Sequence, residues 1–293
     1  MPDGVPTLPV AVAGHDARLK VLQSASQSAT KRLFGRLTAT GDWASAWTGV
    51  GPRLVQVVSA AQVAAAADSV RYMREVIPEL GIPDDAVGTV NPKAFGGVAS
   101  DGRSLEGLVG EVLIRAKVDG LPAGLELLQN VVRLQVQDAA RDAAGVGMTV
   151  RPHVTGWVRM LVPPSCSRCM ILAGKWSRRE AAFSRHPPTC DCRNVPARES
   201  DAADLTVNPR AAVLSGQVTG LSKGSLQAIR DGADPAQVVN AYRGMAPTGR
   251  FTREGVTRRR GLSPRLSPNE ISRVAGSDRA EAVRLLRANG YIL

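Results

Sequence analysis

All four cysteines of this 293-residue chain, together with one histidine, lie within residues 166–192. In order, these residues are Cys166, Cys169, His186, Cys190 and Cys192. Zinc prefers four sulfur or nitrogen ligands in a tetrahedron, and two close cysteine pairs joined by a loop can supply them. The spacing therefore predicts a module closed by a structural zinc ion, which can order a segment that has little core of its own.

Five candidate ligands compete for the four positions of such an ion. Either the four thiolates bind it, or His186 replaces one of them and otherwise supports a ligand or lies on the surface. Two disulfides, or thiols with no ligand role, are the alternatives. The first residues lack the basic-then-apolar layout of a secretory signal, so we expect the chain to fold in cytosol, where thiols stay reduced. This expectation favours a metal ion.

Composition favours a mainly helical protein. Hydrophobic residues make up 44% of the chain but aromatic residues only 4%, so Ala, Val and Leu supply most of the apolar surface, as in closely packed helices. No stretch is long and apolar enough to cross a bilayer, so we expect no membrane partner. The predicted fold class is mainly α, with a small α+β Cys/His module and a basic C-terminal tail of short helices.

Apolar periodicity and capping signals give the expected elements. The predicted helices are 14–36, 42–78 with an interruption at residues 49–52, 104–118, 122–144 ending at the glycines of residues 145–147, 235–243, 268–275 and 278–289. Residues 148–162 are rich in β-branched side chains and predict a strand or hairpin that leads into the cysteines. Residues 248–260 have hairpin character around Glu254-Gly255, and the start of the tail before residue 234 reads as irregular.

The net charge of +11 is concentrated in the second half of the chain. Residues 1–148 carry 14 Lys/Arg against 15 Asp/Glu, residues 149–206 carry 9 against 5, and residues 207–293 carry 14 against 6. Such an excess suggests a polyanionic partner, nucleic acid being the commonest, although a solubilising face or an arginine-rich codon bias would look the same. The candidate phosphate-binding residues are Arg250, Arg253, Arg258, Arg259 and Arg260.

Catalytic interpretations find little support in the sequence. A zinc deaminase would need a His-x-Glu upstream of its cysteine pair, but the upstream histidine is followed by Val154 and Thr155. A protease would need a nucleophile beside a base such as His153, and no motif singles one out. We therefore expect no enzymatic activity, with a protease as the first alternative.

The cysteine region resembles the Mu F-like head-morphogenesis proteins of tailed phages. The similarity rests on Cys166-x2-Cys169 followed by Gly174, and on His186-Pro-Pro-Thr-Cys190-Asp-Cys192 followed by Pro196. Several elements occur in the family's order, over residues 100–200. The spacer between His186 and Cys190 is one residue longer than the family's usual spacer, which makes His186 a weaker candidate ligand than the cysteines. The C-terminal ending and arginine run are similar to those of such proteins from phages of actinobacteria.

The resemblance implies a minor capsid protein of the virion, made in the host cytoplasm and associated with portal and capsid proteins or the head interior. Double-stranded packaged DNA is a further expected partner. The implied organisation is a helical region at 1–98, a Mu F-like domain at 99–205 ending in the Cys/His module, and a basic region at 206–293. A capsid maturation protease or a zinc-ribbon-like nucleic-acid-binding protein are the alternatives.

Overall fold

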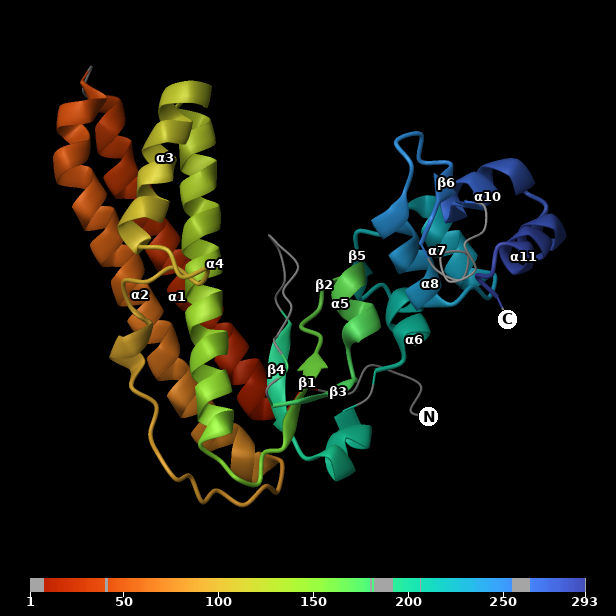
Figure 1. Ribbon diagram of the computed structural model, residues 1–293, viewed down its shortest axis with the longest axis horizontal. Helices are drawn as coiled ribbons and strands as arrows, with labels where there is room; N and C mark the ends of the chain where they lie inside the picture. The colour runs from red at the N-terminus through yellow and green to blue at the C-terminus, as the bar shows by residue number, and fades with distance from the viewer. Residues whose placement is uncertain are drawn as a thin grey trace.

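The computed structural model describes residues 8–39, 42–179, 181, 192–205, 207–254 and 264–292. His186, Cys190 and Arg258–Arg260 lie outside this set. The fold is mainly helical with a small sheet, as predicted from composition. Figure 1 shows long helices at one end, the sheet in the middle and short C-terminal helices at the other end. Among the described residues, no helix combines the length and the apolarity needed to span a membrane.

The long helices form a bundle around an apolar core. They are α1 (Val10–Phe34), α2 (Trp43–Glu79), α3 (Leu105–Asp119) and α4 (Leu121–Thr149), with short 3-10 turns at Gly35–Ala39 and Pro92–Phe95. Leu54, Leu105 and Leu128 are fully buried in one cluster of this core. That cluster draws on both sides of residue 98, and the predicted domain boundary at this residue stays a prediction.

The predicted interruption of the second helix is wrong, because α2 continues through Pro52. A proline inside a helix loses one backbone hydrogen bond and usually kinks or ends it. Here Val50, Leu54 and Val58 fall on one face and are buried against neighbouring helices. Burial of such side chains contributes about 1.5–3 kcal/mol each, enough to hold the helix together across the proline.

The predicted stop at the Gly145–Gly147 segment is also wrong, because α4 runs on to Thr149. A β-carbon at Gly147 would lie 2.9 Å from Cγ of Met73, so this glycine permits close packing of α4 on α2. Met148 is buried in the same core cluster as Met73. The glycine therefore serves helix packing instead of ending the helix.

Gly124 of α4 lies at a close contact between α3 and α4. A β-carbon there would lie 2.6 Å from Cβ of Ala116 and 3.1 Å from the carbonyl oxygen of Val112. We expect Gly124→Ala to destabilise the protein by about 1–3 kcal/mol, the usual cost of overpacking. Gly110 of α3 offers the matched control, because a β-carbon there meets nothing within 4 Å. Gly110→Ala should stabilise the protein by about 1 kcal/mol, because alanine favours a helix more than glycine does. Urea denaturation of the two variants measures both effects. Equal shifts of the two urea midpoints would contradict the close packing assigned to Gly124.

The sheet follows the bundle and consists of three antiparallel strands in the order β3-β1-β4. β1 (Gly156–Met160) is central, between β3 (Trp176–Arg178) and β4 (Arg193–Ala197). The strand predicted within residues 148–162 is therefore confirmed for its second half, while its first two residues end α4. Every residue of β1 and β4 is buried. Met160 and Val195 pack with residues of the bundle, whereas Val158 and Ala197 pack with Ala202 of the following turn.

The remaining elements form a C-terminal group of short helices and strands. They are β2 (Ser165–Cys166), α5 (Ser167–Leu172), a 3-10 turn at Glu199–Leu205, α6 (Pro209–Leu214), β5 (Val218–Thr219), α7 (Lys223–Arg230), α8 (Pro235–Ala241), η4 (Tyr242–Gly244), β6 (Phe251–Thr252), β7 (Arg265–Leu266), α10 (Pro268–Ala275) and α11 (Arg279–Ala288). One apolar cluster joins most of the helices in this group, from Leu161 and Cys169 to Leu286 and Tyr291. The turn at Glu199–Leu205 packs on the three-stranded sheet instead, through Ala202.

Capping signals predicted the last helices of this group correctly. Asp234 and Ser267 accept the backbone N–H three residues on, and a proline follows each of them. The same kind of signal was missed at α6 and α7, in the stretch read as irregular, where Asn208 and Ser222 are the caps. The second half of the hairpin predicted around Glu254-Gly255 lies outside the described residues. In its first half, β6 pairs with β7 and bridges to Met245.

Candidate functional site

The first cysteine pair lies at the start of α5, just after β2. Cys166 caps this helix, and its Sγ accepts the backbone N–H of Cys169 at 3.4 Å. The guanidinium of Arg159, on β1, donates to Sγ of Cys169 at 3.6 Å. Both donors stabilise sulfur in its thiolate form. This is the form that binds metal ions.

Cys192 reaches the same region from the other side of the loop, directly before β4. It is 1% exposed and belongs to the same apolar cluster as the buried Cys169. Cys166 is partly buried and packs against this cluster. Within the described ranges, no three or more His, Cys, Asp or Glu side chains form a group that could hold a metal ion. Cys166, Cys169 and Cys192 lie inside these ranges and do not form such a group by themselves. His186 and Cys190 lie outside them, so the five-residue ligand set stays a prediction.

Strand β4, which continues from Cys192, is anchored to the bundle by a buried ion pair. Nη2 of Arg193 lies 2.7 Å from Oδ1 of Asp16 on α1, and the two side chains are 3% and 7% exposed. The hydroxyl of Tyr72, from α2, donates to the carbonyl oxygen of Asn194 at 3.3 Å. The far end of the cysteine loop is therefore fixed to two bundle helices. Nothing in the spacing of Asp16 and Arg193 predicted this pair.

A second polar group continues this connection between α1 and α2. The ring of His15 stacks on Tyr72 with centroids 4.4 Å apart, and its Nδ1 lies 2.6 Å from Oδ2 of Asp68. Burial lowers the pKa of His15, although its hydrogen bond to Asp68 opposes the shift. Burial alone would raise the pKa of Asp68, but hydrogen bonds from His15 and Arg18 outweigh it and lower the pKa.

Both shifts make the protein less stable in acid. Because the pKa of His15 is lower in the folded state than in the unfolded chain, the unfolded state binds more protons once the pH falls below about 6.5. Asp68 adds to the loss as the pH falls below about 3.9, the ordinary pKa of its carboxyl group. We expect urea midpoints of the wild type to fall from pH 7 towards pH 4, and to fall less steeply in His15→Gln. Parallel curves would show that His15 does not control this loss.

Of the five predicted phosphate-binding arginines, the structure describes two. Nε of Arg250 lies 2.9 Å from Oε1 of Glu270, and Arg273 binds the same carboxylate at 2.7 Å. Hydrogen bonds from Arg273 and Arg250 lower the pKa of Glu270 to about 2, so this carboxylate stays charged and partly neutralises Arg250. The side chain of Arg253 is exposed at the end of β6. Arg253 is therefore the better placed of the two for a phosphate.

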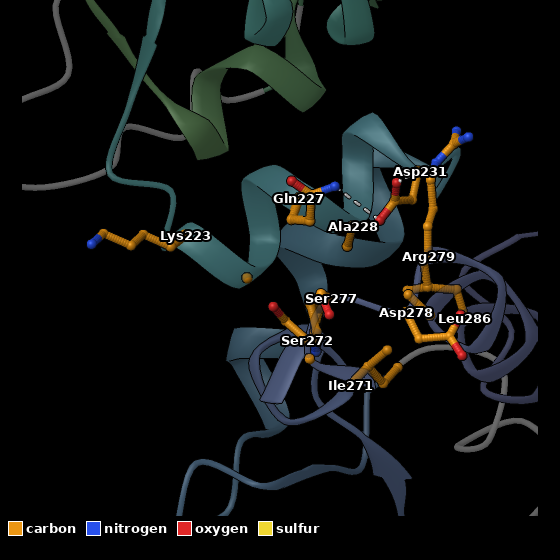
Figure 2. A pocket seen from close by; sticks show the side chains of 14 residues that line it. Lys223, Gln227, Ala228, Asp231, Ile271, Ser272, Ser277, Asp278, Arg279 and Leu286 are labelled. Atoms are coloured by element: carbon orange, nitrogen blue, oxygen red, sulfur yellow. Dashed lines mark hydrogen bonds and ion pairs between the residues drawn. The ribbon is translucent and has the colours of Figure 1, made fainter. Parts of the chain in front are cut away.

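A hollow of about 420 Å³ lies between α7, α10 and α11. Asp231 lies in its wall, where Oδ1 is 3.0 Å from Nε of Arg279 and Oδ2 accepts from Nε2 of Gln227 at 3.1 Å. Figure 2 shows these groups together, with Lys223 extending away from them. Because the carboxylate is already bound by a cation and an amide, the hollow holds a structural ion pair and we assign it no ligand.

His153, the base considered for a protease, lies on the surface between α4 and β1. Its Nε2 is 3.1 Å from Oδ2 of Asp85, and both side chains are about half exposed. A protease would need a hydroxyl or thiol at this position. The neighbour that the structure places at Nε2 is the carboxylate of Asp85, which can orient an imidazole but is not that nucleophile.

Comparison of the chain with protein-family models, with curated proteins and with solved structures finds no match. The fold and site define a helical bundle that is joined, through a three-stranded sheet with cysteines beside it, to a basic unit of short helices. A function for this arrangement has to be argued from the residues themselves. Arg159, which faces Cys169, is the site residue that the sequence analysis missed, and no local pattern could have assigned it a cysteine partner.

Proposed function

We propose that this chain is a minor capsid, head-morphogenesis protein of a tailed phage, Mu F-like in type, which acts as a structural component of the virion. In this role the neutral bundle docks on portal or capsid protein during assembly in the host cytoplasm. The basic C-terminal unit faces the head interior and its packaged double-stranded DNA. The observation that carries the proposal is the ordered Cys/His signature of the sequence. Its described members, Cys166, Cys169 and Cys192, lie at β2, in α5 and directly before β4.

A structural zinc ion is part of this proposal. Cys166, Cys169 and Cys192 would supply thiolates, and Cys190 or His186 would complete the set. Among the described residues, Cys166, Cys169 and Cys192 do not by themselves form a group that could hold a metal ion, so this arrangement requires Cys190 or His186 and a closer approach of the three sulfur atoms. A bound zinc ion would supply a rigid cross-link between α5 and β4 and no chemistry of its own. Two disulfides are the competing arrangement.

DNA contact is tested by the salt dependence of binding. Removal of one phosphate-binding cation should reduce the slope of log affinity against log salt by about 0.9 for a duplex. We expect the triple change of Arg258, Arg259 and Arg260 to Ala to flatten this slope, measured by fluorescence anisotropy with a duplex of mixed sequence. An unchanged slope would remove the arginine run from the DNA contact.

Docking on the portal is tested with a portal protein encoded in the same genome as this chain. Co-expression followed by size-exclusion chromatography should yield a complex, and residues 206–293 should be dispensable for it if the bundle is the docking part. Absence of a complex with either portal or capsid protein would overturn the assignment to the head.

Proteolysis is the second candidate function and has a direct assay. Purified protein incubated with capsid protein should leave it intact if the role is structural. Cleavage that disappears in His153→Ala would reverse the ranking of the two functions.

A further inference from the structure

An apolar hollow of about 520 Å³ opens on the basic C-terminal unit, beside strand β6. Its lining consists of Gly244, Met245, Ala246, Pro247, Phe251, Arg253 and Pro264. Ligand sites in proteins commonly have this size and are mostly apolar with a few polar groups. In this hollow, the one charged lining residue among those described is Arg253. The site therefore offers an apolar surface with a cation at its edge.

The aromatic ring in this hollow is unusual for this protein. Aromatic residues make up only 4% of the chain, and of the described ones that are exposed, Phe251 is 39% and Tyr242 is 41% exposed. Both belong to the same short stretch of the basic unit, η4 and β6. A single exposed apolar side chain is normal on a protein surface, but Phe251 lies in the lining of an apolar hollow, where its ring adds to a larger apolar surface.

Backbone hydrogen bonds hold the hollow in shape. The N–H of Ala246 donates to the carbonyl oxygen of Phe251 at 2.8 Å, and the N–H of Arg253 donates to that of Gly244 at 3.0 Å. The buried hydroxyl of Thr252 donates to the carbonyl oxygen of Ala241 at 2.6 Å. A β-carbon at Gly244 would lie 2.8 Å from the N atom of Glu254, so the glycine allows this close approach. A ligand would meet a preformed surface and would not have to order it.

The charge around the hollow favours a polyanion. The guanidinium carbon of Arg250 lies 5.9 Å from the centre of the Phe251 ring, Arg253 lines the hollow, and the exposed Arg243 directly precedes Gly244. Residues 207–293 carry 14 Lys/Arg against 6 Asp/Glu. Glu270, the carboxylate that binds Arg250, is shared with Arg273. Phosphate groups would therefore be attracted to the rim.

We infer that this surface binds single-stranded nucleic acid, with one unstacked base against Phe251 in the apolar hollow and the flanking phosphates on Arg253 and Arg243. Proteins that hold single strands combine cations along the backbone with aromatic rings on which bases stack. A duplex keeps its base faces stacked inside, so it could use the arginines but not the hollow. The inference rests on the proposed contact with nucleic acid and narrows it to a strand with accessible bases.

The test compares a fluorescein-labelled oligothymidylate with a duplex of equal length, using the full chain. Loss of stacking in Phe251→Ala should weaken single-strand binding about 5- to 150-fold and leave the salt slope and duplex binding unchanged. Phe251→Tyr, which keeps the ring, should restore the affinity. Arg253→Ala should reduce the single-strand salt slope by about 0.7. Arg287→Ala, an exposed arginine of α11, is the matched charge control and should leave the affinity within about twofold.

Three outcomes would overturn the inference in distinguishable ways. Equal binding of both DNAs with no effect of Phe251→Ala would leave the DNA contact of the proposed function intact but remove the role of the hollow. Absence of binding to either DNA would remove that contact itself. Binding of a fluorescein-labelled proline-rich peptide, abolished in Phe251→Ala while neither DNA binds, would make the hollow a peptide site.

Discussion

Replacing Cys169 with serine is expected to release the proposed zinc ion and to unfold the module around α5 and β4. A structural zinc site contributes about 10–16 kcal/mol of apparent binding free energy at pH 7, more than any single contact of the fold. Cys169 is fully buried and its sulfur receives the Arg159 guanidinium, so a hydroxyl group there would leave that cation poorly matched. Mass spectrometry of metal content should give one zinc per wild-type chain and much less in the variant.

The matched control lies between the two cysteines. Ser167→Ala changes the same turn of α5 without touching a proposed ligand, so it should keep its zinc and its thermal midpoint. Metal-free wild-type protein without titratable thiols would contradict the prediction and favour two disulfides. Metal-free protein with four titratable thiols would remove the proposed cross-link altogether.

Loss of the Asp16 carboxylate is expected to cost about 3–5 kcal/mol of unfolding free energy, the usual result of removing one partner from a buried ion pair. In Asp16→Ala, the Arg193 guanidinium would stay buried without a counter-charge. Its Nε and Nη1 have no hydrogen-bond partner among the described residues, so there is no neighbour to take over. Urea denaturation followed by the fluorescence of the four tryptophans, Trp157 of β1 among them, would measure the loss.

Lys20 provides the control for this prediction, because it binds the same carboxylate from outside. Its Nζ lies 2.8 Å from Oδ2 of Asp16, but its side chain is 52% exposed. Exposed pairs contribute about 0–1 kcal/mol, so Lys20→Ala should change stability little. Equal losses of unfolding free energy in Asp16→Ala and Lys20→Ala would contradict the prediction. They would show that water solvates the Arg193 guanidinium in place of Asp16, so that burial adds no extra cost.

The helical part of the fold could be predicted where the signals are local. Asp234 and Ser267 each start a helix through a hydrogen bond that spans three residues, so sequence alone is enough to place α8 and α10. Pro52 and Gly147 misled the prediction for the opposite reason. Their effect on a helix depends on neighbours from other helices, such as Met73 against Gly147, and those neighbours are distant in sequence.

The candidate sites show the same division. The cysteine positions and the arginine-rich tail were evident from spacing and charge. Arg159 meets Cys169 only because the fold brings β1 and α5 together. Arg250 and Arg253 look equivalent in sequence. The structure separates them, because Glu270 of α10 binds Arg250 while Arg253 borders the apolar hollow.

The sequence by itself determined the mainly helical class, the helix starts with local caps, the grouping of the cysteines and the basic character of the last third. Only the tertiary structure decided that α2 and α4 run unbroken, that Asp16 and Arg193 meet 177 residues apart, and that Phe251 stays open beside arginines. The physical reason is the range of the interactions. Caps and charge density act within a few residues, whereas burial and ion pairing depend on which distant segments come to lie against each other.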